Sequence, residues 1–182
     1  KIMSTGKDFV VYLSKKFYPG PAYYEKGIRT ACIQIERPSP NAKIRRSDYI
    51  ERIETFKQAN EIFEALLMNA EGYLTEGSKS NLFFVRRGEP DAVYTAPREM
   101  VLEGIMRQYV LDLCGQENIS VKFEPIRYSA LGDVEALFIT GTSINVLPIA
   151  KVDEIQYNSP ENSTVLRIMH AFQNYLDTIT KG

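Results

Sequence analysis

Residues 73–81, YLTEGSKSN, form the stretch around which the rest of the chain is organised. They place an acidic residue, Glu76, and a small-residue turn between two apolar runs, residues 63–68 and residues 82–85. Both runs are short and bounded by turn residues, which is typical of buried strands. Glu76 is therefore expected at the edge of a core, where an ionised carboxylate is costly unless a fixed positive partner meets it. That partner is either an ordinary lysine or arginine, or part of a bound ligand.

The same stretch also has a simpler explanation. Glu-Gly with serines nearby is common turn chemistry, and taken alone these residues are better explained as only a turn. The choice between a turn and a site therefore depends on what accompanies Glu76 further along the chain.

Length and composition are those of an ordinary soluble globular protein. The 182 residues fit one large domain or two small ones, with 44% hydrophobic and 25% charged residues. The formal net charge of −1 argues against a nucleic-acid binder that neutralises phosphates. No apolar run approaches the roughly 18 residues of a membrane-spanning helix. Cys32 and Cys114 lie far apart in apolar contexts, which indicates free thiols in a reducing, cytoplasmic compartment rather than a disulfide or a metal site.

The pattern of apolar residues predicts many short strands with interspersed helices. Strands are predicted at residues 9–13, 27–36, 63–68, 73–76, 81–86, 92–95, 119–123, 135–140 and 146–149. Helices are predicted at residues 47–60, 104–115, 128–131 and 163–180. Residues 18–24, with two prolines and a glycine, are predicted to be a loop. This mixture predicts the α+β class, with a mixed or antiparallel sheet and packed helices.

Three glycine-containing turns at strand ends are candidates for a binding site: EGSKSN at 76–81, LEGIM at 102–106 and TGTSIN at 140–145. Gly104 leads a helix, whose free N–H groups and dipole attract an anion. The last turn offers backbone N–H groups beside the hydroxyls of Thr140, Thr142 and Ser143. Two such turns and a buried acid suit a ligand that carries a phosphate and a protonated ring nitrogen. Glycine turns also end strands in many proteins, and each one alone is a weak signal.

Three motifs, taken together, are more specific than any single turn. They are Glu76-x-Ser78-x-x-Asn81-Leu82-Phe83, Tyr94-Thr95 and Leu102-x-Gly104-Ile105-x-Arg107. In combination they resemble the signature of the class IV aminotransferases, which are fold-type IV pyridoxal-phosphate enzymes. That family includes branched-chain aminotransferases, D-amino-acid aminotransferases and aminodeoxychorismate lyase. The resemblance covers roughly residues 18–180.

The resemblance implies a role for several residues in binding pyridoxal 5'-phosphate. Lys43 would be the catalytic lysine that forms the Schiff base and later moves a proton, although a lysine beside Arg45 and Arg46 is otherwise a solvated surface charge. Glu76 would pair with the pyridine nitrogen and keep it protonated. Tyr49 would hydrogen-bond the ring hydroxyl, but its offset from Lys43 is not the usual one.

The same resemblance assigns the two later turns. Leu102 would pack on the face of the cofactor ring. At the helix that Gly104 leads, the amides of Ile105 and Met106 would hold the phosphate, with help from Thr142. The substrate-binding residues would be the backbone of Gly141, Thr142 and Ser143. Many transaminases have a hydroxyl residue at the position of Met106, and here the sequence is closer to the lyase branch.

The resemblance also implies an arrangement of domains. Family members normally have a smaller N-terminal domain that supplies a phosphate-binding arginine and much of the substrate pocket. Residues 18–182 are therefore expected to form the cofactor-binding large domain. Residues 1–17 are expected to be a strand or a connection to a small N-terminal domain that is missing from this sequence.

The implied function is transfer of an amino group between an amino acid and a 2-oxo acid, with a branched-chain type favoured and a homodimer as the working form. Two alternatives remain open from the sequence. One is a lyase that eliminates pyruvate from aminodeoxychorismate. The other is a non-catalytic isolated domain that keeps the fold but does not bind the cofactor alone.

Overall fold

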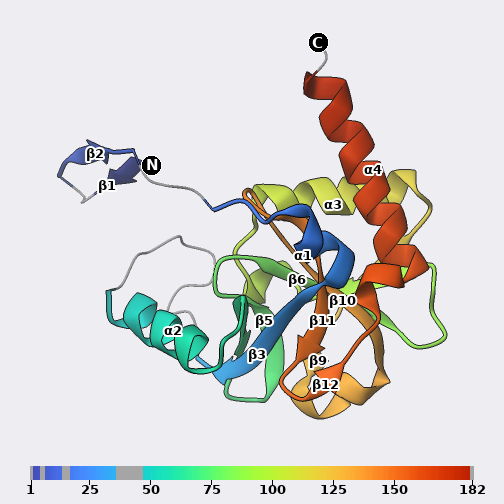
Figure 1. The fold of residues 1–182 in the computed structure, drawn as a ribbon, viewed down its shortest axis with the longest axis horizontal. Helices are drawn as coiled ribbons and strands as arrows, with labels where there is room; N and C mark the ends of the chain where they lie inside the picture. Colours follow the sequence, from blue (N-terminus) through green and yellow to red (C-terminus); the bar gives the residue numbers. More distant parts are fainter. Residues whose placement is uncertain (1, 5–6, 14–16, 36–46, 181–182) are drawn as a thin grey trace.

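A computed structural model of the chain describes residues 2–4, 7–13, 17–35 and 47–180 (Figure 1). Its helices are α1 (Pro21–Lys26), α2 (Ser47–Ala59), α3 (Ile105–Gln116) and α4 (Ser163–Thr180), with short 3-10 helices η1 (Arg98–Met100), η2 (Tyr128–Asp133) and η3 (Ser159–Glu161). Its strands are β1 (Ile2–Ser4), β2 (Phe9–Val11), β3 (Ile28–Gln34), β4 (Glu64–Met68), β5 (Tyr73–Gly77), β6 (Asn81–Arg86), β7 (Ala92–Thr95), β8 (Ser120–Phe123), β9 (Ile126–Arg127), β10 (Val134–Gly141), β11 (Asn145–Val152) and β12 (Ile155–Gln156).

The large sheet closes on itself into a barrel. Its strand order is β8-β7-β6-β10-β11-β3-β4-β5-β9, and β6 also pairs with β5. The ring therefore runs from β6 through β10, β11, β3, β4 and β5 back to β6. The pairs β11–β3, β3–β4 and β7–β8 are parallel, while the other pairs are antiparallel. This confirms the predicted α+β class with a mixed sheet.

Apolar side chains fill the inside of the barrel and the spaces under the helices. Each strand of the ring contributes inward-facing residues, among them Ile28, Leu66, Leu74, Leu82, Leu137 and Leu147. On one side of the barrel α3 and α4 cover Phe83 and Phe138, whose rings stack with centroids 5.0 Å apart. On another side α2 packs its Ile53 on β4. The helices thus cover the outer face, which follows from the alternation of side chains along each strand.

A bulge in β5 decides which way Glu76 points. Between two neighbouring ladder pairs, β5 contributes one residue more than β4. An extra residue in a strand reverses the alternation of its side chains beyond that point. Leu74 accordingly lies inside the barrel, whereas Glu76 pairs with Asn81, which alternates with the inward-facing Leu82. Glu76 therefore lies on the outer face of the barrel wall.

Two helix predictions were wrong in part. Residues 21–24 of the predicted loop are helical and belong to α1, because Pro21 occupies the first helical turn, where its fixed φ and missing N–H suit a helix. Gly27 ends α1 at φ +72°, and a Cβ there would lie 2.8 Å from the Cβ of Ala150. Helix α3 continues past the predicted end at Gly115 to Gln116, and Asn118 at φ +56° follows it as a left-handed cap residue.

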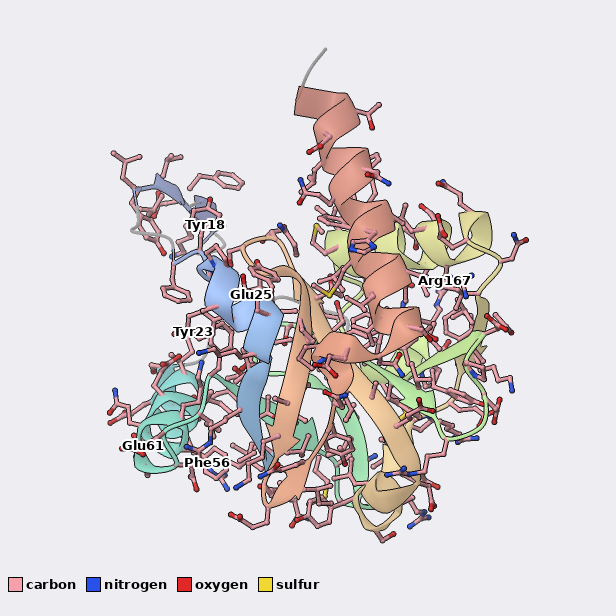
Figure 2. The ribbon with its side chains drawn as sticks, turned by 45° about the vertical axis from the view of Figure 1, so that its right-hand side comes forward. Tyr18, Tyr23, Glu25, Phe56, Glu61 and Arg167 are labelled. Atoms are coloured by element: carbon pink, nitrogen blue, oxygen red, sulfur yellow. The ribbon has the colours of Figure 1, made fainter. Side chains whose placement is uncertain are left out.

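The ends of the chain extend away from the barrel. Strands β1 and β2 form an antiparallel pair that lies apart from the rest (Figure 1). Tyr23 of α1 (Figure 2) forms a cluster of three rings with Phe17 and Phe63, with centroid distances of 5.4–6.1 Å. At the other end, Arg167 fixes α4 through a 2.8 Å ion pair with Asp91 (Figure 2).

In the described part of the chain, no helix combines the length and apolar character that crossing a bilayer requires.

Candidate active site

The carboxylate of Glu76 is held in place by two donors on the outer face of the barrel. Glu76 is only 2% exposed. Glu76 Oε2 accepts hydrogen bonds from the backbone N–H of Leu102 at 3.1 Å and from Asn81 Nδ2 at 3.4 Å. Asn81 Nδ2 also donates to the carbonyl of Leu102 at 2.8 Å. These bonds tie strands β5 and β6 to the segment before α3, and they hold the carboxylate in one orientation.

The start of α3 lies directly against this group. Gly104 is its N-cap residue and supplies no side-chain cap, and a Cβ at this position would come within 2.4 Å of Asn81 Oδ1. Only glycine therefore allows α3 to begin so close to β6. The side chain of Ile105 is exposed, whereas Met106 packs on the core under α3 and α4. The free amides of the first helical turn form an anion-binding end beside Glu76.

The turn between β10 and β11 lies beside the turn between β5 and β6. A Cβ on Gly141 would lie 3.5 Å from the carbonyl oxygen of Lys79, which is ordinary van der Waals contact. The turn itself is closed by a 3.1 Å hydrogen bond from Ile144 N–H to the carbonyl of Gly141. Thr142 is exposed and Ser143 is half-buried. The three turns predicted from the sequence thus meet at one end of the barrel.

A buried positive charge lies close to the same group. Arg107 in the first turn of α3 is 3% exposed, and its Nη2 donates to the carbonyl of Ala96 at 2.9 Å. Its guanidinium also lies 5.6 Å from the ring centre of Phe123. Burial lowers the pKa of Arg107, and the carboxylates of Glu103 and Glu76 act in the opposite direction. Arg107 thus places a buried positive charge in the region of Glu76, although its own hydrogen bond goes to the carbonyl of Ala96.

A second buried carboxylate closes the barrel behind this site. Glu64 Oε1 accepts from Ser78 Oγ at 2.5 Å and from the amide of Ala65 at 2.9 Å, while its Oε2 accepts from Ser80 Oγ at 3.1 Å and the amide of Lys79 at 3.3 Å. These bonds fix the turn that carries Glu76. The sequence analysis missed Glu64, although an acid inside the apolar run FEALLM was a signal for a buried, hydrogen-bonded carboxylate.

Two further residues were assigned to the site from the resemblance. Lys43 lies outside the described residues. Tyr49 lies in the first turn of α2, where it is half-buried and packs on the core under that helix. Helix α2 covers β4, the strand next to β5, so that Tyr49 and Glu76 lie on the outer face of neighbouring parts of the wall.

The residues present fit pyridoxal 5'-phosphate. The ring of this cofactor has a nitrogen that accepts a proton, and a buried, fixed carboxylate suits such a group. Its phosphate suits the N-terminal end of α3, where Gly104 supplies no side-chain cap for the first amides. Both features lie on the same face and are joined through Asn81.

Comparisons with known proteins agree with this geometry. The family model described as amino-transferase class IV matches residues 3–152. A probable branched-chain-amino-acid aminotransferase of Aquifex aeolicus is 34% identical over 60% of this chain and 35% of its own length. A putative branched-chain-amino-acid aminotransferase of Methanocaldococcus jannaschii is 31% identical over 73% of this chain and 47% of its own length.

A solved structure shows the same fold. An aminotransferase from Brucella abortus bound to the cofactor PLP superposes with a TM-score of 0.71 at 26% identity, over 82% of this chain and 54% of that one. The chain thus spans about half or less of the length of these relatives. Since the family model covers most of the described residues and the fold is that of fold-type IV enzymes, the chain belongs to the class IV aminotransferase family.

Proposed function

We propose that the protein is a pyridoxal-phosphate-dependent aminotransferase that moves an amino group between a branched-chain amino acid and a 2-oxo acid. The observation that carries this proposal is the buried Glu76 carboxylate fixed beside the N-terminal end of α3, which has no side-chain cap. The names of the two curated relatives favour branched-chain substrates.

In this proposal Glu76 holds a proton at the ring nitrogen of the cofactor. The two hydrogen bonds to its Oε2 fix the direction of the carboxylate, and its burial strengthens its interaction with a positive charge. When bound, the cofactor supplies an electron sink for the substrate carbon. Leu102, whose backbone contacts Glu76, would cover one face of the ring and exclude water from it.

The two glycine turns would bind the anionic groups. The amides of Ile105 and Met106, which follow Gly104 at the uncapped start of α3, would hold the phosphate, with Thr142 assisting. The backbone of Gly141, Thr142 and Ser143 would orient the carboxylate of the substrate. The short distance between Gly141 and the carbonyl of Lys79 supports this assignment, because it brings this turn close to the turn that carries Glu76.

The remaining roles concern Lys43 and Tyr49. Lys43 would carry the cofactor covalently in the resting enzyme and move the proton between two carbon atoms during transfer. Tyr49 would donate or accept a hydrogen bond at the ring hydroxyl. Its hydroxyl is buried, which suits a contact with a ligand rather than with bulk water.

The whole enzyme is part of the same proposal. Residues 18–182 would form its cofactor-binding domain, and residues 1–17 would connect to a smaller domain. It would work as a homodimer, which sedimentation velocity of the full-length protein would test. A cytoplasmic location agrees with the two free thiols, Cys32 and Cys114, the latter of which is buried.

Chemical trapping tests the assignment of Lys43. Full-length protein incubated with the cofactor is treated with borohydride, digested and mapped by mass spectrometry. We expect the pyridoxyl mass on the peptide that contains Lys43 and its absence in a Lys43→Arg variant. A pyridoxyl mass on another lysine, or on none, would contradict the assignment.

Product analysis tests the reaction itself. With leucine and 2-oxoglutarate, we expect glutamate and the 2-oxo acid of leucine to appear in equal amounts. Pyruvate release from aminodeoxychorismate without any acceptor would instead identify the enzyme as a lyase. No reaction in either assay, with cofactor absent from Lys43, would identify a non-catalytic domain.

A further inference from the structure

Within the part of the chain that the structure describes, Thr140 has a buried hydroxyl without a hydrogen bond. The residue is 1% exposed, and its Oγ1 has no hydrogen-bond partner among the described residues. Other buried threonines of the barrel behave differently. Thr95 Oγ1 donates to the carbonyl of Leu82 at 2.8 Å, and Thr30 Oγ1 donates to the carbonyl of Lys151 at 3.0 Å. A buried hydroxyl without a partner destabilises a protein, so its presence needs an explanation.

The strand register places this hydroxyl beside the candidate site. Thr140 of β10 lies opposite Asn81 of β6, and Asn81 lies opposite Glu76 of β5. Opposite residues of an antiparallel pair share one face, with Cβ atoms about 4.5–5.5 Å apart. Glu76, Asn81 and Thr140 therefore form a polar row across three neighbouring strands, on the outer face of the barrel.

The start of α3 covers this row. Gly104 contacts Asn81, the middle member of the row, and α3 packs on β10. Thr140 also directly precedes Gly141, where the turn to β11 begins. Thr140 therefore lies next to the Gly141 turn, on the strand that α3 covers. Met106 in that first turn offers an amide but no hydroxyl, and its side chain packs into the core.

We propose that the hydroxyl of Thr140 is a further ligand of the cofactor's phosphate, to which it donates a hydrogen bond from below the N-terminal end of α3. This inference rests on the proposed function, because it requires that the cofactor binds on this face. The row then has two ends with separate tasks. Glu76 meets the positively charged ring and Thr140 meets the negatively charged phosphate, while Asn81 holds the two strands and α3 together.

Replacing Thr140 with valine separates this role from ordinary packing. Valine has nearly the same volume and lacks only the hydroxyl. Hydrogen bonds to charged groups are the stronger ones, so we expect the Kd of full-length Thr140→Val for pyridoxal 5'-phosphate to rise by about 10- to 100-fold. The Kd for pyridoxal, which has no phosphate, should not change. Thr140→Ser, which restores a hydroxyl, should recover most of the affinity for pyridoxal 5'-phosphate.

The cofactor-free protein gives a second readout with a matched control. Thr140→Val removes an unsatisfied group, so we expect its thermal midpoint to equal or exceed that of the wild type. Thr95→Val removes a hydroxyl that bonds a backbone carbonyl in a neighbouring strand. That variant should melt at a lower temperature and bind pyridoxal 5'-phosphate with unchanged affinity.

The outcomes distinguish this inference from the function on which it rests. If wild-type protein binds pyridoxal 5'-phosphate and Thr140→Val binds it equally well, the role of Thr140 is refuted and the proposed cofactor stands. An equal loss of pyridoxal 5'-phosphate and pyridoxal affinity would also refute the role, since it indicates general damage to the site. Failure of the wild type to bind either compound would overturn both proposals.

Discussion

Two buried glutamates on neighbouring strands of the same barrel wall are used in different ways. Glu64 is the first residue of β4, lies opposite Thr30 of β3 and points into the barrel. It accepts hydrogen bonds from two serine hydroxyls and two backbone amides. Glu76 lies on the outer face of β5, and its hydrogen bonds from Leu102 and Asn81 both reach the same oxygen, Oε2. The inner carboxylate joins parts of the chain to one another. The outer one also bonds the segment before α3, and it lies beside the N-terminal end of that helix, which has no side-chain cap.

The difference arises from the face of the barrel wall on which each glutamate lies, since the residue type is the same. Inside the barrel a carboxylate is surrounded only by protein, so both of its oxygens need donors from the chain. On the outer face, the bulge in β5 turns Glu76 toward the start of α3. There the N-cap residue is Gly104, which has no side chain. We therefore expect a buried acid to mark a binding site when a helix N-terminus without a side-chain cap lies beside it.

The largest expected effect follows from removing the charge of Glu76. We expect Glu76→Gln to lower kcat for leucine transamination by about 10²- to 10³-fold, the range found when one preorganised electrostatic contact is lost. Glu76→Ala should reduce activity at least as much. Steady-state kinetics with 2-oxoglutarate measures the loss, and circular dichroism shows whether the fold is kept. Near-normal activity in either variant would contradict the role of Glu76 at the ring nitrogen.

The second expected effect is on stability and concerns Glu64. Hydrogen bonds to a charged group contribute about 1.5–3 kcal/mol each, and Glu64→Gln would disturb several of them, so we expect the free energy of unfolding to fall by about 3 kcal/mol or more. Urea denaturation of the cofactor-free protein measures this change. Glu76→Gln is the matched control and should be less destabilised. An unchanged urea midpoint for Glu64→Gln would show that the inner carboxylate does not hold the barrel end.

The sequence predicted the elements better than their mutual arrangement. Helix α4 has the bounds that its apolar spacing predicted, and β7 also agrees with its prediction. Local signals were sufficient there, because helical spacing and short apolar runs are properties of adjacent residues. Helix α1 was missed because prolines and glycines were taken to indicate a loop throughout, although proline is favoured in the first helical turn.

The candidate site was predictable in its residues and not in its geometry. The sequence identified Glu76, Gly104 and the Gly141 turn, because each is a local motif. It did not place Asn81 and Thr140 in one row, because that row depends on the strand order β5-β6-β10. The bulge that turns Glu76 outward is a single extra residue, which leaves no trace in the apolar pattern of β5.

The smallest expected effect concerns Lys79, which lies in the turn between Glu76 and Asn81 and contacts both the inside of the barrel and its surface. Its backbone amide bonds Glu64 inside the barrel, and its Nζ forms a 2.5 Å ion pair with Glu54 on α2. The hydrogen bond from Lys79 lowers the pKa of Glu54 below its usual range. Stability from this pair is therefore fully present above the ordinary glutamate pKa, and it is lost as the pH falls through the lowered value.

Because both side chains are largely solvated, the pair should contribute only about 0.2–1 kcal/mol even at neutral pH. Urea denaturation of Lys79→Met, Glu54→Gln and the double variant at pH 7 measures this coupling. At pH 3, and at high salt, we expect the coupling to decrease, whereas the bonds of the Lys79 amide to Glu64 do not involve the side chain that is replaced. A loss in Lys79→Met as large as that in Glu64→Gln would mean that the surface pair, not the inner carboxylate, fixes the turn that carries Glu76.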